Sequence, residues 1–294
     1  MLFTVIIPTY NRAHIICETI ESVLNQTYSD FEIIIIDNFS TDNTIEILEK
    51  YKSDKRIRLI VSDKNYERSR SRNVGIEFAK GNFLSFLDSD DLMGPDCLKD
   101  AHEYILKHKN VKIFHNKYLF CDQNKKIIKT YQDKINYELP FNSILKGNFL
   151  ACIGVFICQD IYKNFLFLED KAIIGSEDWL FWIQIIAHSR QIGHIDKVNS
   201  YIVQHSGRTE NNRNPFEFEK QINLLQEIVS KSISLNKTEK KIFDFSTSFL
   251  IASDYCDAKE KKIAFKIVKR ILKKNPSLIF NIKILNLIKN LILR

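Results

Sequence analysis

Three carboxylates follow directly on an apolar run in the segment Gly81–Asp91, which reads GNFLSFLDSDD. Asp88, Asp90 and Asp91 are so close in sequence that their charges repel one another, and a divalent cation that prefers oxygen ligands relieves such repulsion. The apolar run has the length of a buried strand, and ligands of open α/β sheets bind at the carboxyl ends of strands. The sequence therefore predicts a cation site here. An acidic turn that caps a helix starting near Pro95 is the alternative interpretation, since Asp commonly precedes a helix.

Alternating apolar and amphipathic segments in the first half of the chain must position these acids. Four short runs rich in Ile, Val and Phe have the character of fully buried parallel strands: Leu2–Ile7, Phe31–Ile36, Ile57–Val61 and Phe83–Leu87. Segments with helical spacing lie between them, at His14–Leu24, Thr41–Tyr51 and Arg68–Ala79. Strands joined by helical crossovers predict an α/β fold with a doubly wound, Rossmann-like and mostly parallel sheet flanked by helices. Neither a GxGxxG nor a Walker A sequence occurs, which argues against a dinucleotide-dependent dehydrogenase and a P-loop enzyme.

Composition and cysteine usage limit the class of protein. Of the 294 residues, 45% are hydrophobic and 27% are charged, as in a folded protein with one large domain or two smaller ones. The six cysteines form no CxxC pair, so we expect reduced thiols and neither a zinc site nor a disulfide framework. The N-terminus leads directly into a strand pattern, without the features of a secretory signal. We therefore expect a cytoplasmic protein.

Positive charge is concentrated at the C-terminal end. Residues 259–294 contain eleven basic side chains and one acid, a net charge of +10, so residues 1–258 carry −3 of the total of +7. Helical apolar spacing begins at Pro215, and Pro276 starts a last helix with a broad Leu and Ile face whose polar interruptions argue against a membrane span. We expect an interfacial helix on an anionic membrane surface. The alternative is a helical cap that packs this face on the catalytic domain. Nucleic acid is not an expected partner, because the aromatic and glycine features of common binding modules are absent.

Five ordered motifs give the chain a family resemblance. They are PTYNR (Pro8–Arg12), QTYSDFEIIIIDNFSTDNT (Gln26–Thr44), SRNVGIEFAKG (Ser71–Gly81), FLDSDD (Phe86–Asp91) and GSEDWLFW (Gly175–Trp182). In this order and at these spacings, the chain resembles a glycosyltransferase of family 2 with the GT-A fold. The resemblance covers residues 1–210 and implies a GT-A domain there, followed by a helical, basic C-terminal extension over residues 211–294.

The resemblance implies a site for a nucleotide-sugar donor, whose departing diphosphate builds negative charge that a metal ion and nearby cations stabilise. Asp88 and Asp90 would form the acidic pair of the DxD motif and hold Mg²⁺ or Mn²⁺, and His205 would complete the metal site unless it is a structural histidine. The donor would contact Pro8, Thr9, Tyr10, Arg12, Asp37, Asn38, Arg72, Asn73, Asp88 and Ser89. Asn38 departs from the family, which commonly has Asp there to accept the uracil imide hydrogen. An amide can accept that hydrogen but can also donate.

Glu177 and Asp178 precede an aromatic helix and form a second acidic centre. Inverting transfer needs one carboxylate that takes the proton from the acceptor hydroxyl while this hydroxyl attacks the anomeric carbon. By resemblance Asp178 is that base, and Glu177 positions the acceptor or the loop. Two acids that cap a helix and complement its dipole are the alternative interpretation. Arg68 and Arg70 also have two interpretations, a role at the donor or a solvated helix face.

Together these features predict an inverting, metal-dependent glycosyltransferase that moves a hexosyl or N-acetylhexosaminyl group from a UDP-sugar to a hydroxyl of a growing glycan. Residues 92–174 would build the acceptor side. The basic tail favours a lipid-linked acceptor, as in bacterial surface polysaccharide or lipooligosaccharide assembly, and a peripheral position on the inner face of the cytoplasmic membrane. One alternative is a catalytically silent scaffold that binds a sugar nucleotide. The other is a nucleotidyltransferase, whose glycine-rich basic loop is missing from PTYNRAH.

Overall fold

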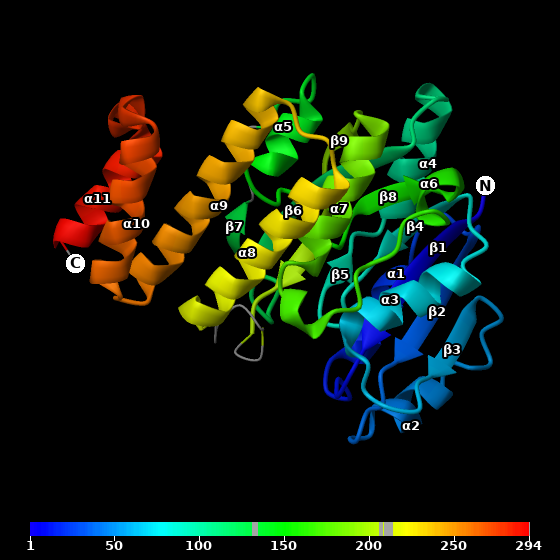
Figure 1. Ribbon diagram of the computed structural model, residues 1–294. Helices are drawn as coiled ribbons and strands as arrows, with labels where there is room; N and C mark the ends of the chain where they lie inside the picture. Colours follow the sequence, from blue (N-terminus) through cyan, green and yellow to red (C-terminus); the bar gives the residue numbers. More distant parts are fainter. Residues whose placement is uncertain (131–134, 206–207, 209–213, 294) are drawn as a thin grey trace.

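A computed structural model describes residues 1–130, 135–205, 208 and 214–293 of the chain (Figure 1). Its first four strands are β1 (Phe3–Thr9), β2 (Phe31–Asp37), β3 (Ile57–Val61) and β4 (Phe83–Phe86), and they lie parallel in the order β3-β2-β1-β4. The crossover helices are α1 (Ile16–Leu24), α2 (Thr44–Glu49) and α3 (Glu67–Phe78). The strands and helices predicted for this half are therefore confirmed, with small shifts at their ends.

The central parallel strands form because their side chains are buried on both faces of the sheet, whereas β3 at the edge is only partly buried, contrary to the expectation for Ile57–Val61. Every residue of β1 is buried, and Ile33–Ile36 of β2 have no exposed surface. Helix α3 approaches β1 closely at Gly75, where a Cβ atom would lie 2.5 Å from Ile6 Cγ2. A larger residue at this position would push α3, and with it Arg72, away from the sheet.

Beyond β4 the sheet becomes mixed. The remaining strands are β5 (Leu92–Met93), β6 (Ile113–Cys121), β7 (Ile127–Thr130), β8 (Val155–Cys158) and β9 (Gly193–Val203), and the order is β3-β2-β1-β4-β8-β6-β9-β5, with β7 paired to β6. Strand β8 runs antiparallel to both β4 and β6, while β9 runs parallel to β6. The expected parallel arrangement therefore holds for the first four strands, and beyond them it recurs in the β6–β9 pair of the described sheet. Apolar runs indicate that a strand is buried, but not which neighbour it pairs with or in which direction.

Helix α7 holds the second acidic centre in place. The other elements between β5 and β9 are α4 (Cys97–Lys107), α5 (Pro140–Leu145), α6 (Gln159–Tyr162) and the 3-10 turn η1 (Lys171–Ile173), and α7 spans Glu177–Ser189. Trp182 is fully buried, and Phe181 stacks on Phe167 with ring centroids 3.9 Å apart. This dense packing fixes the direction of α7, so its first turn presents Glu177 and Asp178 at a fixed place.

Helices form the C-terminal extension: α8 (Pro215–Ser232), α9 (Lys237–Asp257), α10 (Lys261–Lys274), the 3-10 turn η3 (Pro276–Phe280) and α11 (Ile282–Leu293). The expected domain boundary between residues 210 and 211 lies outside the described residues. The single helix predicted from Pro276 is wrong, because η3 and α11 are separated by Asn281, whose backbone is extended. Asn281 Oδ1 accepts the Lys283 N–H at 2.9 Å, so this side chain starts a new helix.

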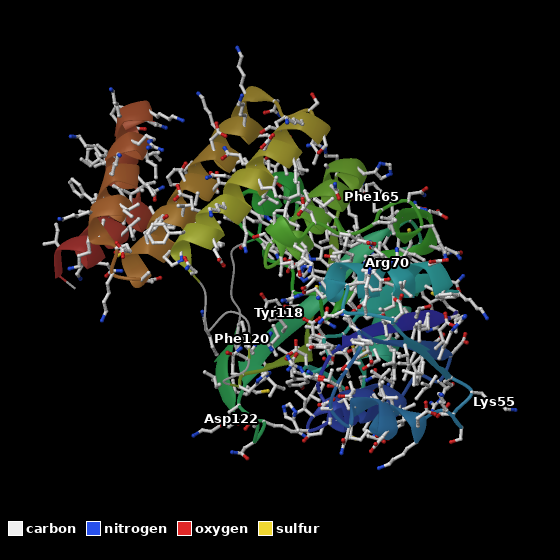
Figure 2. The ribbon with its side chains drawn as sticks, turned by 60° about the horizontal axis from the view of Figure 1, so that its bottom comes forward. Lys55, Arg70, Tyr118, Phe120, Asp122 and Phe165 are labelled. Atoms are coloured by element: carbon white, nitrogen blue, oxygen red, sulfur yellow. The ribbon has the colours of Figure 1, made fainter. Side chains whose placement is uncertain are left out.

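The elements α10, η3 and α11 form a C-terminal hairpin at the end of the molecule opposite β1–β3 (Figure 1 and Figure 2). One face of the hairpin packs internally and against α9, through buried side chains such as Ile267 and Leu287. Other apolar side chains are open to solvent among exposed lysines, including Phe280 (86% exposed) and Ile282 (71% exposed). Among the described residues, the hairpin therefore packs on α9 of the C-terminal extension, and not on the catalytic domain as in the alternative considered for the tail. Within the described part of the chain, no helix is long and apolar enough to cross a membrane.

Candidate active site

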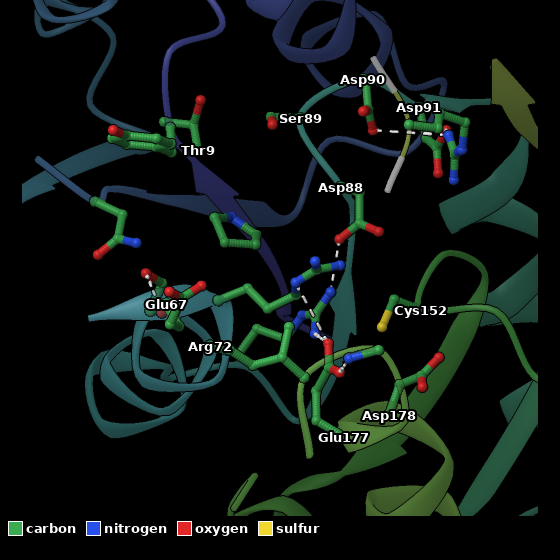
Figure 3. Close-up of a pocket in the computed structure, with 18 of the residues that line it drawn as sticks. Thr9, Glu67, Arg72, Asp88, Ser89, Asp90, Asp91, Cys152, Glu177 and Asp178 are labelled. Carbon is green, nitrogen blue, oxygen red and sulfur yellow. Dashed lines mark hydrogen bonds and ion pairs between the residues drawn. The ribbon is translucent and has the colours of Figure 1, made fainter. Parts of the chain in front are cut away.

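A pocket of about 670 Å³ lies at the edge of the sheet where β1, β4, α3 and α7 meet (Figure 3). All five sequence motifs contribute to its wall, because the carboxyl ends of parallel strands meet at one edge. The predicted site residues that line it are Pro8, Thr9, Tyr10, Arg12, Asn38, Arg72, Asp88, Ser89, Asp90, Glu177 and Asp178. In Figure 3, Thr9 lies toward one end of the pocket, Arg72 in the middle and Asp178 toward the other end.

Arg72 joins the two acidic centres. Its side chain is 2% exposed, its Nη2 donates to Asp88 Oδ1 at 2.8 Å, and its Nη1 donates to Glu177 Oε1 at 3.3 Å. Burial works to lower the pKa of the Arg72 guanidinium, but the acidic groups around it outweigh burial, and the pKa is raised. Burial likewise works to raise the pKa of Asp88, but the attraction of Arg72 outweighs it, and that pKa is lowered. Arg72 and Asp88 therefore form a charged pair in which Arg72 is buried and Asp88, 32% exposed, lines the pocket.

Asp90 and Asp91 have different hydrogen-bond partners, although Arg208 lies within ion-pair distance of both. Asp90 Oδ2 lies 3.3 Å from Arg12 Nη2 and 3.0 Å from His205 Nε2. Asp91 is 2% exposed and accepts hydrogen bonds from Arg208 Nη1 at 2.9 Å and from a backbone N–H at the end of β9 at 3.1 Å. None of the three acids caps the following helix, α4. Asp91 therefore ties the acidic loop to β9, while Asp90 and His205 face each other.

The residues predicted to hold a divalent cation fit that task. Asp90 Oδ2 lies 3.0 Å from His205 Nε2; Asp88 and Asp90 line the pocket, whereas His205 is not part of its lining. Carboxylate oxygens are preferred ligands of Mg²⁺, and Mn²⁺ also accepts imidazole. Among the described residues, no group of three or more His, Cys, Asp or Glu side chains could hold a metal ion alone. A bound ion would therefore complete its coordination with phosphate oxygens of the donor and with water.

Asp178 lies in the first turn of α7, beside Glu177. Its Oδ2 accepts from Asn148 Nδ2 at 3.0 Å, and its Oδ1 accepts the Trp179 N–H at 2.7 Å, so one oxygen does cap the helix. Burial raises the pKa of Asp178 to about 7, and the negative charge of Glu177 acts in the same direction. A carboxylate with this pKa can accept a proton efficiently near neutral pH, so capping and base catalysis are compatible here.

Buried polar atoms without partners mark the remainder of the site. Within the described residues, four buried side-chain atoms lack a hydrogen bond: Thr9 Oγ1, Asp37 Oδ1, Arg72 Nε and Trp182 Nε1. Thr9 and Asp37 pair across β1 and β2 at the carboxyl ends of these strands. Asp37 lies behind the lining of the pocket, and its other oxygen accepts the Ser40 N–H at 2.9 Å. Since each unsatisfied buried polar atom costs about 1–3 kcal/mol, the first three atoms point to a polar ligand.

Asn38 is held by the segment that precedes α3. Its Oδ1 accepts the Tyr66 N–H at 3.0 Å, and its Nδ2 donates to Asn65 Oδ1 at 2.8 Å. A carboxylate could not make the second contact, so the departure from Asp serves the position of this loop. Asn38 still lines the pocket, and its contact with uracil stays a prediction.

Three further side chains of α3 have different surroundings. Asn73 lies outside the lining of the pocket, where its amide donates to Phe167 O at 2.9 Å and its oxygen accepts the Phe167 N–H at 2.8 Å. Arg68 lines the pocket. Arg70, labelled in Figure 2, has a side chain that is 47% exposed and lies 3.4 Å from Glu169. The donor role considered for Arg68 therefore has structural support, whereas Asn73 anchors a neighbouring segment and Arg70 is a surface residue.

Sequence analysis missed the contribution of α8 to the pocket. Asn214, Glu217, Phe218 and Gln221 line it from the C-terminal extension. Their spacing of three, four and seven residues places them on one face of the helix. This pattern can be read from the sequence, but the sequence does not indicate what that face meets.

Comparisons with known proteins agree on one family. The family model described as glycosyl transferase family 2 matches residues 4–163. The Escherichia coli UDP-Glc:alpha-D-GlcNAc-diphosphoundecaprenol beta-1,3-glucosyltransferase WfaP is 30% identical over 231 residues, which are 79% of this chain and 88% of that protein. An uncharacterized glycosyltransferase of Haemophilus influenzae is 33% identical over 193 residues, which are 65% of this chain and 74% of that protein.

A solved structure supports the same conclusion. The structure of S. aureus TarS 1–349 in complex with UDP-GlcNAc matches this chain with a TM-score of 0.68 and 26% identity, over 84% of this chain and 72% of that chain. The α/β architecture expected from the five motifs, with its helical C-terminal part, is thereby confirmed as the GT-A fold.

Proposed function

Because the chain belongs to glycosyl transferase family 2 and has the GT-A fold, we propose that it transfers a sugar, with inversion, from a UDP-sugar to a hydroxyl of a lipid-linked glycan. One observation carries the proposal. Arg72 connects Asp88, which would face the donor diphosphate, to Glu177, the neighbour of the proposed base, inside one pocket. The donor site and the base are thus parts of one charge network.

The nucleoside would occupy the end of the pocket between β1 and β2. Thr9 Oγ1 and Asp37 Oδ1 are buried there without hydrogen-bond partners among the described residues. Hydroxyl or imide groups of a nucleoside would satisfy Thr9 at the lining and, once the lining residues move aside, Asp37 behind it. Tyr10 lines the same end and is 41% exposed, so its ring offers a surface on which a base can stack. These contacts account for the polar atoms that the protein leaves unpaired.

The diphosphate would lie in the middle of the pocket, beside Arg12 and Arg72. Asp88, Asp90 and His205 would hold Mg²⁺ or Mn²⁺, which stabilises charge on a leaving diphosphate when it is bound. The guanidinium of Arg72 stabilises the same charge, and it is already fixed by Asp88, so little reorganisation is needed as the bond to the sugar breaks.

Asp178 would act as the base. It accepts the proton of the acceptor hydroxyl while this hydroxyl attacks the anomeric carbon from the face opposite the diphosphate, which inverts the configuration. Its raised pKa suits proton transfer near neutral pH. Glu177 is a positioning residue, because its carboxylate holds Arg72 on one side and accepts the Gly175 N–H on the other.

The names of two similar proteins support the choice of substrates. WfaP is named for transfer from UDP-Glc to alpha-D-GlcNAc-diphosphoundecaprenol, and TarS was solved with UDP-GlcNAc. We therefore propose a UDP-hexose or UDP-N-acetylhexosamine donor, an acceptor sugar carried on a lipid diphosphate, and a place in surface polysaccharide assembly on the cytoplasmic face of the membrane.

Transfer can be tested directly with purified protein, Mn²⁺, a panel of UDP-, GDP-, dTDP- and CMP-sugars, and a synthetic lipid-linked alpha-GlcNAc diphosphate. Nucleotide release and labelled lipid product should appear with one UDP-sugar, and the product should have the opposite anomeric configuration by NMR. Asp178→Asn and Asp90→Asn should each lose at least 100-fold in rate. Asp160→Asn, whose side chain is 77% exposed, is the matched control. Donor binding without any transfer would favour the silent scaffold.

The C-terminal hairpin would hold the enzyme at an anionic membrane surface. It combines nine lysines and arginines among residues 261–293 with exposed apolar side chains at Phe265, Ile279, Phe280, Ile282, Leu285 and Ile292. Charge near an anionic leaflet contributes about 1 kcal/mol per basic residue, and each inserted large apolar side chain adds about 1.5–3 kcal/mol. The basic residues and the exposed apolar side chains therefore both favour binding to an anionic membrane surface.

Sedimentation with phosphatidylglycerol-containing vesicles and with pure phosphatidylcholine vesicles tests this attachment. Wild type should bind the anionic vesicles, and binding should weaken at high salt. The double variant Phe280→Ser/Ile282→Ser should bind at least tenfold more weakly, since both side chains are exposed and their loss leaves the fold intact. Leu106→Ser on α4, where the side chain is 58% exposed, is the control. Unchanged binding of the double variant would exclude the hairpin as the anchor.

A further inference from the structure

Helix α8 lies against the segment that carries the proposed base. The pocket includes Gly175, whose φ of +97° is left-handed, and a Cβ atom at this position would lie 3.6 Å from Gln221 Oε1. Gly175 in turn donates its N–H to Glu177 Oε2. The C-terminal extension is therefore part of the wall beside the second acidic centre, and it is more than an appendage that follows the catalytic fold.

The polar side chains of this helix face are available to a ligand. Glu217 and Gln221 are four residues apart and line the pocket together. Neither side chain has a hydrogen bond or an ion pair with another residue in the described ranges 1–130, 135–205, 208 and 214–293. Other polar groups of α8 do have partners: Gln226 donates to Asp244 at 2.6 Å, and Glu227 pairs with Lys231. Glu217 and Gln221 thus combine a place in the pocket wall with polar groups that no other described residue engages.

Charge separates the pocket into two parts. Arg12, Arg72 and Arg208 stand around the acidic loop after β4, where a diphosphate carries its negative charge. The α8 wall instead contributes an acid and amides and no basic side chain to the lining, so it offers nothing that would offset the charge of a diphosphate. A pyranose with several hydroxyls suits the α8 wall, because it can donate to Glu217 and exchange both kinds of hydrogen bond with Gln221.

We infer that the α8 face forms the acceptor subsite, in which Glu217 and Gln221 bind hydroxyls of the acceptor sugar and orient its attacking hydroxyl toward Asp178. The inference rests on the proposed function and extends it to named residues outside the five motifs. It also shifts part of the acceptor side from residues 92–174, where the sequence placed it, to the C-terminal extension. A chain with the same five motifs but another sequence at this helix face would select another acceptor.

Steady-state kinetics of four variants tests the subsite. With UDP-glucose, Mn²⁺ and synthetic lipid-linked alpha-GlcNAc diphosphate, Glu217→Ala and Gln221→Ala should each raise the KM for the acceptor by about five- to tenfold. The KM for UDP-glucose and the Kd for UDP from calorimetry should stay within twofold of wild type. Glu227→Ala and Asn223→Ala replace the same kinds of side chain on exposed positions of α8 and should leave every constant unchanged.

Two results would overturn the inference, and they differ from failure of the proposed function. Acceptor KM values within twofold of wild type for both pocket variants would remove α8 from acceptor binding. Equal losses in UDP affinity and in acceptor KM would show a general distortion of the pocket. A wild-type enzyme that transfers no sugar to this acceptor, while the variants bind UDP normally, would refute the proposed acceptor and with it the subsite for that sugar.

Discussion

Replacing Asp178 with Asn should abolish transfer and, at the same time, stabilise the folded protein above neutral pH. The pKa of Asp178 is raised to about 7 by burial and by Glu177, whereas an Asp in an unfolded chain titrates near about 3.9. Below about pH 3.9 both states hold the proton, and the group does not affect stability. As the pH rises from there to about 7, the unfolded chain releases its proton first, so the folded state loses stability. Above about pH 7 the loss is complete.

The size of the effect follows from the width of this window. Each pH unit corresponds to about 1.4 kcal/mol, and between pH 5 and pH 8 the window covers about two units, so an isolated buried acid would contribute about 3 kcal/mol. Partial exposure and salt screening reduce this, and we expect about 1–2 kcal/mol. The amide of the variant has one acceptor oxygen, so it loses one of the bonds to Asn148 and the Trp179 N–H at every pH. The free energy of this lost hydrogen bond does not depend on pH, so it cancels when the free energies of unfolding at two pH values are compared.

Urea unfolding followed by tryptophan fluorescence measures the difference, because both tryptophans of the chain, Trp179 and Trp182, lie in α7 beside residue 178. The free energy of unfolding of Asp178→Asn relative to wild type should be about 1–2 kcal/mol more favourable at pH 8 than at pH 5. Asp160→Asn, at a surface position, should show no such difference. An effect of Asp178→Asn that is equal at both pH values would refute the argument from burial, whatever happens to activity.

Three further predictions use the same site. Wild-type kcat/KM should fall about tenfold per pH unit below about pH 7, because the base must be ionised, and a flat pH profile would argue against Asp178 in that role. Arg72→Lys should lower the free energy of unfolding by about 3 kcal/mol and abolish transfer, since one ammonium cannot replace both contacts of a buried guanidinium. Urea unfolding and transfer assays measure both effects, and Arg70→Lys on the exposed side of α3 is the control. Thr9→Val should raise the free energy of unfolding without ligand by about 1 kcal/mol and weaken UDP binding in calorimetry, whereas equal UDP affinity would remove the hydroxyl from the donor site.

The first half of the fold could be predicted because its evidence is local. Apolar runs such as Phe31–Ile36 have strand length, and amphipathic segments separate them, so the parallel order follows from general rules of connection. The acids after β4 and at the start of α7 could be predicted for the same reason, since each motif is contiguous. The predictions that the structure confirms are therefore those that depend on contiguous segments of the sequence.

The remainder depends on contacts between distant segments. Nothing near Arg72 in the sequence indicates that it meets Glu177, which lies 105 residues away. Strand β8 pairs antiparallel with β4 because of the path by which the chain comes back to the sheet. The apolar pattern of its four residues is compatible with a parallel or an antiparallel neighbour. The α8 face has a clear helical spacing, but only the structure brings it to the wall of the pocket. The break before α11 was missed because Asn281 starts a helix by a side-chain contact within a strongly apolar segment.

The buried polar atoms of the site that lack hydrogen bonds destabilise the folded protein, and this bears on what the site binds. In the described part of the chain, three of the four buried side-chain atoms without hydrogen bonds belong to Thr9, Asp37 and Arg72, all of which the motifs had assigned to the donor. Each of these atoms lowers the free energy of unfolding by about 1–3 kcal/mol, which is a large part of the typical total of about 5–15 kcal/mol. A structural role would favour apolar replacements of the same shape, because those would remove the cost without a change of fold. Their positions at the carboxyl ends of β1 and β2 and beside Asp88 match the nucleoside and diphosphate parts of one ligand. The proposed sugar nucleotide would satisfy these unpaired atoms, whereas a helix cap or a surface turn leaves them unexplained.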